Sequence, residues 1–359
     1  MKKIMIVFGG RSSEHEVSLN SAKNIYKALD KKKYLPLLVS ISKEGTWYMI
    51  EEKTFLEKKA VLDSEMTDST PISVVSFHGK TSIVNLKNFE KTSFDCVFPI
   101  IHGTNGEDGT LQGYFKILNV PFVGCGVLSS SLCMDKEFMK VVLTGKGIPN
   151  SKYMVVHKEG APATYDQLAK QLGSPFFIKP ANAGSSVGVH KVKSADDYTK
   201  KIADAFLYDH KVIAEEFIKG REIECSVMGL NHGATPATPG ELNVKHEFYS
   251  YEAKYLDDNG AEIIIPANLP PAKTEELRAL AKKTYEAMSC DGMARVDFFM
   301  KENGDLLVNE LNTLPGFTKI SMYPMMWEAH GLPYTELISE LIDLAFKKYD
   351  RDAQIKLTF

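Results

Sequence analysis

Cysteine is scarce in this sequence, and the few cysteines present are not paired. The 359 residues include five cysteines, an odd number, and no two of them have the CxxC spacing. Unpaired cysteines of this kind are typical of reduced thiols in the cytoplasm, and their spacing argues against a zinc site. The scarcity therefore predicts a cytoplasmic protein without a cysteine-based zinc centre.

Long apolar runs are also missing. A membrane-spanning helix needs about 18 consecutive apolar residues, and no stretch of the sequence approaches that length. The apolar stretch at 4–8 is five residues long and ends in Gly9-Gly10, so it is too short for the apolar region of a signal peptide. We therefore expect neither a membrane partner nor a secreted protein.

An excess of one charge is the third feature that the sequence lacks. Lys and Arg number 43, Asp and Glu number 46, and the formal net charge is −3. This balance argues against a nucleic-acid partner, because such proteins neutralise phosphates with a basic surface. Hydrophobic residues (44%) and charged residues (25%) have ordinary shares for a folded globular chain. The length predicts two to three domains of about 150 residues each.

The first part of the chain has an α/β pattern. Short buried strands are predicted at 4–8, 35–41 and 94–101, and apolar residues recur at helical spacing over 17–29. Strands that alternate with helices favour a parallel sheet, with ligands at the carboxyl ends of the strands. Residues of about 50–92 contain short strands that the pattern does not order.

Two smaller units follow, and residues 147–150 form a natural break in the chain. A helix is predicted over 129–145, and the strands after it form an α+β unit; these strands are 153–156, 176–179, 187–192, 211–215 and 222–229. A third unit begins in the 230s and contains a helix with Thr274 as its N-cap, a strand pair at 294–300 and 305–312, and a last helix near 334–347. We predict three domains: 1–128, 129–230 and 231–359.

The strand pair carries the clearest chemical signal. Side chains alternate faces along a strand, so Arg295, Asp297 and Phe299 share one face, and Glu310 and Asn312 share a face of the partner strand. Carboxylate and amide oxygens suit Mg²⁺, which takes its other ligands from water and substrate phosphates. An adjacent arginine suits a group on which negative charge develops. The alternative is a solvated sheet face with scattered charges, but the apolar flanking residues favour metal and phosphate chemistry.

A loop rich in glycine and serine gives a second, weaker signal. Lys179 ends a strand, and the small residues of 184–188 follow it. Backbone N–H groups in such a loop can approach phosphate oxygens, and the lysine adds a positive charge. A plain hairpin turn fits this stretch equally well, and the P-loop pattern GxxxxGK[ST] occurs nowhere in the chain.

The turn after the first strand is a third candidate. Ser13 and Glu16 have the spacing of a capping box at a helix start. That arrangement leaves Glu14 free at the edge of the sheet, where its carboxylate can meet a ligand ammonium. His102 follows another buried strand and fits either a core histidine or a site residue.

Six stretches are longer and more specific than these spacings. They are residues 9–18 (GGRSSEHEVS), 102–113 (HGTNGEDGTLQG), 134–136 (MDK), 184–188 (GSSVG), 251–255 (YEAKY) and 309–318 (NELNTLPGFT). Together they resemble the D-alanine–D-alanine ligase family of the ATP-grasp superfamily, over the whole chain apart from about 50–92 and the last ten residues. The resemblance implies an α/β ATP-grasp fold, in which an N-terminal Rossmann-like domain with a parallel sheet accompanies two α+β domains that clamp ATP.

The resemblance also implies where ATP and metal ions bind. Lys136 and Lys179 correspond to phosphate-binding lysines, and Ser185 and Ser186 to the loop that closes over the phosphates. The implied adenine and ribose residues are Glu215, Glu216, Phe217, Ile218, Glu222 and Phe299. The implied ligands of two Mg²⁺ ions, for which Mn²⁺ can substitute, are Asp297, Glu310 and Asn312.

The implied reaction joins two D-alanines at the expense of ATP, through a D-alanyl phosphate, for peptidoglycan precursor synthesis by a cytoplasmic homodimer. Glu14 corresponds to the residue that binds the first D-alanine's ammonium, in a hydrogen-bonded set with Ser185 and Tyr255. The implied residues around the reacting carboxylate and the second D-alanine are His102, Lys254, Tyr255, Arg295, Gly316 and Ser321. A polar loop at 249–260 is the expected lid.

Two alternatives remain at this point. A D-alanyl-D-serine or D-alanyl-D-lactate ligase of the same family shares the ATP and metal residues, although the run that contains Lys254 and Tyr255 favours D-alanine as the second substrate. A catalytically silent relative is expected to have lost Arg295, Asp297 or Glu310, and all three are present.

Overall fold

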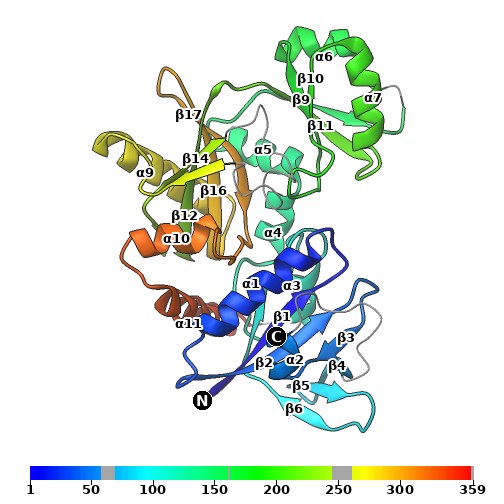
Figure 1. Cartoon of the computed structure of the whole chain (residues 1–359), viewed down its shortest axis with the longest axis vertical. Coiled ribbons are helices and arrows are strands. Elements are labelled where there is room, and N and C mark those ends of the chain that lie inside the picture. Colours follow the sequence, from blue (N-terminus) through cyan, green and yellow to red (C-terminus); the bar gives the residue numbers. More distant parts are fainter. Residues whose placement is uncertain (58–68, 161, 245–260, 357–359) are drawn as a thin grey trace.

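The computed structural model describes residues 1–57, 69–160, 162–244 and 261–356, and in these residues it shows three β-sheets with helices packed around them (Figure 1). The first sheet belongs to the N-terminal part of the chain, the second to the central part and the third to the C-terminal part. None of the helices in the described ranges is both long and apolar enough to cross a membrane.

The N-terminal sheet has seven strands in the order β6-β5-β4-β3-β2-β1-β7. Their bounds are β1 (Lys2–Gly9), β2 (Tyr34–Ile41), β3 (Trp47–Met49), β4 (Thr70–Phe77), β5 (Lys80–Asn85), β6 (Lys91–Ser93) and β7 (Cys96–Pro99). β1 pairs in parallel with β2 and β7, as the sequence predicted for its first strands. The other four strands extend the sheet in antiparallel fashion. Three of them, β4 to β6, and the short helix α2 (Glu52–Glu57) come from the stretch that the pattern left unordered.

Strand β1 is buried on both faces, which explains its continuous apolar run. Ile4, Ile6 and Phe8 belong to a core that also contains residues of α1 (His15–Ala28) and α11 (Tyr334–Asp352). Met5 and Val7 belong to a separate core on the opposite face, where α3 (Thr110–Ile117) packs. Helix α11, from the far end of the chain, therefore completes one face of the N-terminal sheet.

The central sheet has four strands in the order β10-β9-β11-β8 and a core of its own. Its strands are β8 (Tyr153–His157), β9 (Phe176–Pro180), β10 (His190–Val192) and β11 (Lys211–Glu216), and its helices are α6 (Tyr165–Leu172) and α7 (Ala195–Ala205). All pairs are antiparallel. This unit is the green part of the chain at the upper right of Figure 1.

The third sheet includes one strand that the sequence placed in the central unit. Its strands are β12 (Gly220–Leu230), β13 (Thr235–Pro236), β14 (Gly240–Val244), β15 (Ala261–Ile264), β16 (Asp291–Lys301) and β17 (Leu306–Asn312). The sequence placed strand 222–229 in the central unit, but β12 pairs with β16 along its whole length, so that assignment was wrong. Strand pairing over a sequence distance of about 70 residues leaves no local pattern. The three domain ranges themselves stay a prediction.

The helices around the third sheet are η1 (Asn231–Gly233), α9 (Pro271–Ala287), α10 (Met322–Ala329) and α11. The predicted N-cap of α9, Thr274, is wrong, because the helix already begins at Pro271. Proline suits the first helical position, since its fixed φ is helical and it has no N–H to satisfy there. Thr274 lies inside the helix, where its hydroxyl donates to the carbonyl oxygen of Pro270.

Two further helix starts differ from the predictions, and both shape the site. The predicted helix over 129–145 is two helices, α4 (Val127–Met134) and α5 (Lys136–Gly145). Asp135 separates them, because its carboxylate accepts hydrogen bonds from the backbone N–H groups of Glu137 and Phe138 as the N-cap of α5. Helix α1 begins at His15 without a side-chain cap, so the capping box that the spacing of Ser13 and Glu16 allowed does not form.

Candidate active site

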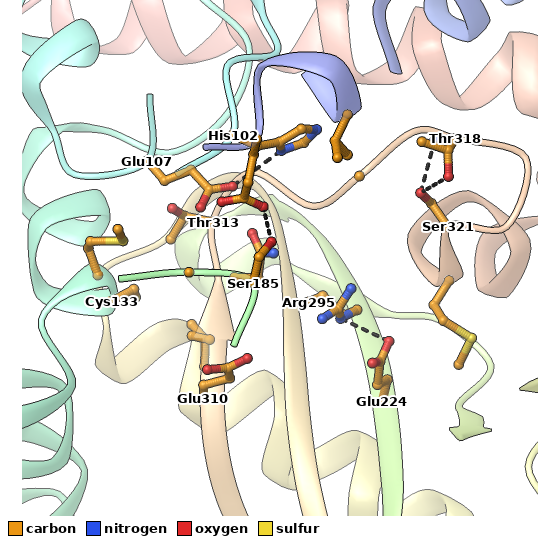
Figure 2. Close-up of a pocket in the computed structure, with 18 of the residues that line it drawn as sticks. His102, Glu107, Cys133, Ser185, Glu224, Arg295, Glu310, Thr313, Thr318 and Ser321 are labelled. Atoms are coloured by element: carbon orange, nitrogen blue, oxygen red, sulfur yellow. Dashed lines mark hydrogen bonds and ion pairs between the residues drawn. The ribbon is translucent and has the colours of Figure 1, made fainter. Parts of the chain in front are cut away.

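A cavity of about 290 Å³ lies where side chains from the three sheet units meet (Figure 2). Nine of the residues singled out in the sequence line it: Glu14, His102, Lys136, Ser185, Arg295, Glu310, Asn312, Gly316 and Ser321. These residues come from positions 14 to 321, so the fold brings together most of the motifs.

Glu14 joins the first unit to the glycine- and serine-rich loop. It precedes α1 and is buried, and the Ser185 hydroxyl donates a hydrogen bond to Glu14 Oε1. Ser185 and Ser186 have φ angles of 49° and 59°, in the left-handed region that non-glycine residues seldom adopt. A Cβ atom at Gly103 or Gly184 would lie 2.6 or 3.0 Å from Glu14 Oε2, so glycine leaves room for the carboxylate. The loop is thereby held against Glu14.

His102 is a buried residue with partners on both ring nitrogens. Its Nε2 lies 3.1 Å from Ser21 Oγ, and its Nδ1 lies 3.3 Å from Glu107 Oε1 and 3.1 Å from the Leu314 carbonyl oxygen. Burial disfavours the charged imidazole, but the hydrogen bond and charge of Glu107 and the charge of Glu14 outweigh burial and raise the pKa of His102. The ring therefore lies at the cavity wall beside two carboxylates (Figure 2).

The paired strands β16 and β17 present the acidic face that the sequence predicted. Arg295 pairs with Asn312 and Asp297 pairs with Glu310 across the strands, so these side chains share one face. The register shifts between Asp297 and Phe298, which leaves Asn309 as an extra residue on β17. Arg295 donates to both oxygens of Asp297, with Nε–Oδ1 and Nη2–Oδ2 distances of 2.7 Å.

The donor set of this face fits a hard divalent cation. Asp297, Glu310 and Asn312 offer two carboxylates and an amide oxygen, and the guanidinium of Arg295 already accompanies the Asp297 carboxylate as a cation. Across the described ranges, no three His, Cys, Asp or Glu side chains are grouped so that they could hold a metal ion by themselves. Water and phosphate oxygens would therefore have to complete the coordination.

Lys136 is placed by the start of α5. Its backbone N–H donates to the Ala181 carbonyl oxygen at 3.0 Å, and its Nζ donates to the Ala183 carbonyl oxygen at 2.6 Å. Burial lowers the pKa of Lys136, and the charge of Glu310 partly opposes this effect. The ammonium thus lies between the glycine- and serine-rich loop and the acidic strands.

Glu215 lies among cations behind this face. Its Oε2 is 3.1 Å from Lys179 Nζ, 3.5 Å from Lys140 Nζ and 3.1 Å from Ser151 Oγ. Lys179 Nζ also contacts Asn309 Oδ1 at 3.4 Å. Burial alone would raise the pKa of Glu215, but the charges of Lys140 and Lys179, with hydrogen bonds from Lys179 and Ser151, outweigh burial and lower it to about 2. This carboxylate is therefore ionised at neutral pH.

The residues expected at adenine and ribose lie where the central sheet continues into the third. Glu216 ends β11 and accepts a hydrogen bond from the Lys152 backbone N–H at 2.7 Å. The ring of Phe217 lies 6.0 Å from that of Phe177, and Lys191 Nζ lies 4.2 Å from its centre. The remaining members of this set are Ile218, which follows Phe217, and Glu222 and Phe299, which pair across β12 and β16. They are not part of the cavity lining described above.

Gly316 and Ser321 form a tight turn at the cavity's third wall. The Thr318 backbone N–H donates to Ser321 Oγ at 2.9 Å, and the two hydroxyl oxygens are 2.8 Å apart. A Cβ atom at Gly316 would lie 2.7 Å from Ser321 Oγ, so glycine permits the close approach. Lys254, Tyr255 and the predicted lid at 249–260 lie outside the described residues.

Three residues of the site were missed from the sequence. Glu224 lines the cavity and lies 2.9 Å from Arg295, Glu107 contacts His102, and Lys140 holds Glu215. Glu224 lies two residues after Glu222 on the same strand face, so strand alternation could have indicated it. Glu107 lies within the recognised stretch 102–113, and Lys140 lies one helical turn after Lys136.

The four-stranded unit and the third sheet, with lysines between them and an acidic strand pair beside them, define a protein of the ATP-grasp class, in agreement with similar solved structures. Two family models match the chain: the "D-ala D-ala ligase N-terminus" over residues 3–125 and the "D-ala D-ala ligase C-terminus" over residues 142–343. The chain therefore belongs to the D-alanine–D-alanine ligase family.

Individual relatives agree with this assignment. The D-alanine–D-alanine ligase of Shouchella clausii is 44% identical over 359 residues, which cover 99% of this chain and 97% of that protein. Among solved structures, the D-alanine–D-alanine ligase from Coxiella burnetii is 37% identical with a TM-score of 0.87, covering 98% of this chain and 96% of that one. The VanG D-Ala:D-Ser ligase from Enterococcus faecalis is 34% identical with a TM-score of 0.86, covering 96% and 99%.

A structure with bound nucleotide is also similar. The D-alanine–D-alanine ligase from Bacillus anthracis complexed with ATP is 27% identical with a TM-score of 0.74, covering 98% of this chain and all of that one. The similarity to this complex and the family assignment support ATP as a ligand of this fold.

Proposed function

We propose that this chain ligates two D-alanines to D-alanyl-D-alanine, with release of ADP and phosphate, and so supplies a peptidoglycan precursor. The single observation that carries the proposal is the cavity in which Glu14, Arg295 and the acidic strands β16 and β17 face one another. A site for an amino-acid ammonium and a site for a phosphoryl group are thus adjacent.

ATP would lie between the central unit and the third sheet. Lys136 and Lys179 would bind its phosphates, and Ser185 and Ser186 would cover them through the loop. The residues for adenine and ribose would be Glu215, Glu216, Phe217, Ile218, Glu222 and Phe299. Support comes from the two lysines, whose present partners are a carbonyl oxygen and carboxylate or amide oxygens that a phosphate can replace.

Asp297, Glu310 and Asn312 would hold two Mg²⁺ ions, with Mn²⁺ as a substitute. Metal ions held there would supply positive charge to offset the negative charge of the phosphates. The chain's own contribution is to orient these three oxygen donors on adjacent strands and to keep apolar residues behind them.

The first D-alanine would bind through its ammonium to Glu14. Its carboxylate then attacks the γ-phosphate of ATP, which yields D-alanyl phosphate and ADP. Ser185 holds Glu14 in place, and His102 lies beside it with a raised pKa that favours a positive charge near the substrate carboxylate. Correct positioning of the two reactants accounts for most of the rate in such a step.

The second D-alanine would bind near Ser321, and its neutral amine would attack the carbonyl of D-alanyl phosphate. Collapse of the tetrahedral adduct would form the peptide bond and expel phosphate, which takes up the proton that the amine loses. Arg295 and the backbone N–H of Gly316 would stabilise the tetrahedral oxyanion. Lys254 and Tyr255 would belong to the lid that excludes water from the acyl phosphate. The geometric support is that Arg295, Gly316 and Ser321 line one cavity.

We further propose that the protein is a cytoplasmic homodimer, as the resemblance to the family implies. The five cysteines are free and buried, which fits a reducing compartment. Size-exclusion chromatography with light scattering tests the dimer, and a monomer at micromolar concentration would contradict it.

One assay tests the reaction and its alternatives. ADP release is measured with D-alanine alone and with D-alanine plus D-serine or D-lactate, and the masses of the products are determined afterwards. D-alanyl-D-alanine as the main product is expected. A D-alanyl-D-serine or D-alanyl-D-lactate ligase is not favoured by the named full-length relatives, and either product as the main one would overturn the choice of second substrate. No ADP release with any D-amino acid would contradict the ligase proposal.

A further inference from the structure

Arg295 lies between two carboxylates on neighbouring strands. Its guanidinium donates two hydrogen bonds of 2.7 Å to the Asp297 carboxylate. Its Nε also lies 2.9 Å from Glu224 Oε2 (Figure 2). Glu224 on β12 and Asp297 on β16 are direct cross-strand partners, so both carboxylates are fixed on one face of the sheet. The arginine therefore has two acidic neighbours whose positions the sheet determines.

These three groups are all largely removed from water. The side chains of Arg295, Asp297 and Glu224 are 18%, 12% and 7% exposed. Arginine is protonated throughout the pH range in which proteins are folded. The arginine therefore stays charged and needs a carboxylate partner in every state of the site.

Asp297 cannot pair with Arg295 through both of its oxygens and bind a divalent cation at the same time. At present both of its oxygens accept hydrogen bonds from the guanidinium. A cation bound to Asp297 takes at least one of these oxygens and repels the positive guanidinium, so Arg295 loses part of its pairing. Glu224 is then the adjacent carboxylate that keeps the guanidinium paired.

We propose that Glu224 is a positioning residue that retains Arg295 at the cavity wall when Asp297 becomes a metal ligand. The inference rests on the metal site of the proposed function. In this structure Arg295 lies between Asp297 and Glu224, and with a metal ion on Asp297 it would rely on Glu224. Glu224 thus makes metal binding less costly and keeps the guanidinium aimed at the cavity where negative charge develops.

The test is a double-variant cycle on metal affinity with the full-length protein. Free Mn²⁺ is measured by electron paramagnetic resonance in the presence of a non-hydrolysable ATP analogue. The proteins compared are wild type, Glu224→Gln, Arg295→Met and the double variant. We expect Glu224→Gln to weaken Mn²⁺ binding by about 10- to 100-fold, the range found for residues that support metal ligands. In the Arg295→Met background the same change should have a several-fold smaller effect.

The outcomes separate the two proposals. Equal weakening in both backgrounds would show that Glu224 acts through its own charge and would overturn the inference alone. No weakening in the wild-type background would overturn it as well. A wild-type protein that binds no Mn²⁺ with the nucleotide analogue would overturn the metal site of the proposed function, and the inference with it.

Glu241→Gln is the matched control, because Glu241 is a buried carboxylate of the same sheet whose partner is Arg221, at 2.6 Å for both oxygens. Its replacement should leave Mn²⁺ affinity unchanged.

A second measurement needs no variant of Arg295. Glu224→Asp keeps the charge, so at saturating metal ion and ATP it should retain much more of the wild-type kcat than Glu224→Gln. Equal losses of kcat in the two variants would contradict the positioning role.

Discussion

Two charged clusters beside the cavity have opposite designs. Around Glu215, one carboxylate lies among cations, with Lys140 and Lys179 as its partners. Around Arg295, one cation lies among carboxylates, with Asp297 and Glu224 as its partners. The first cluster presents positive charge toward the place proposed for phosphates, and the second presents negative charge toward the place proposed for metal ions.

The difference teaches how a charged ligand can enter a buried site. In each cluster one ligand-binding group is already paired inside the protein, so it is not left buried without a counter-ion before the ligand arrives. In the proposed function, a phosphate would take Lys179 away from Glu215, which would keep Lys140. A metal ion would take Asp297 away from Arg295, which would keep Glu224. Each cluster therefore contains a second partner that the ligand does not touch.

The largest effect is expected for removal of the central cation in the second cluster. Arg295→Ala should lower kcat by about 10²–10³-fold, because loss of one donor to an oxyanion costs about 2.7–4 kcal/mol. Steady-state kinetics of ADP release measures this change. Arg221→Ala, which removes another arginine of the same sheet, is the control and should leave kcat near wild type. Near-wild-type turnover of Arg295→Ala would refute the role of Arg295.

Removal of the untouched partner in the first cluster should mainly affect stability. Lys140→Met leaves Glu215 with Lys179 as its remaining ammonium partner among these contacts and should lower the free energy of unfolding by about 3 kcal/mol. Urea denaturation measures the change. Addition of Glu215→Gln to this variant should restore most of the loss, because the buried negative charge is then gone. A double variant that is less stable than Lys140→Met would contradict the ion-pair explanation.

The contribution of the Glu215 cluster to stability should depend on pH in the acid range. The folded-state pKa of Glu215 is about 2, below its ordinary value of 4.5, so its stabilising contribution is fully present above pH 4.5. That contribution is lost as the pH falls from 4.5 through about 2. The difference in unfolding free energy between wild type and Glu215→Gln should therefore shrink over this range. A difference that does not change with pH would contradict the low pKa.

The smallest effect is expected at the edge of the cavity, outside both clusters. The pKa of His102 is raised by Glu107, so the charged imidazole contributes stability below the ordinary value of 6.5 and loses that contribution as the pH rises through the folded pKa. An NMR titration should place the pKa of His102 above 6.5, and Glu107→Gln should lower it. An unchanged pKa in that variant would assign the shift to other groups.

The sequence indicated much of this site, because its chemistry is concentrated in short local patterns. Without knowledge of the fold, strand alternation places Asp297 and Arg295 on one face of their strand. It likewise places Glu310 and Asn312 on one face of the next strand. The fold adds the register that pairs these faces and the bulge at Asn309, which brings that amide to Lys179. Neither feature leaves a periodic signal.

Other parts depended on long-range contacts and were missed for that reason. Strand β12 joins the third sheet through pairing with β16, and this pairing brings Glu224 to Arg295. Lys140 on α5 contacts Glu215 on β11, about 75 residues further along the chain. Glu224 and Lys140 are nevertheless close in sequence to Glu222 and Lys136, which the motifs identified. The stretch of about 50–92 contributes strands at the edge of the first sheet, away from the cavity, which fits its lack of motifs.

Helix α11 has a consequence for how the protein is made. Its apolar side chains share one core with β1 and α1, so the C-terminal part of the chain covers part of one face of the N-terminal sheet. Because synthesis proceeds from the N-terminus, that part of the face stays exposed on the ribosome until residues 334–352 have emerged. The central unit, which has its own core, can fold before then. During synthesis, the first part of the chain to be made is thus among the last to be completed.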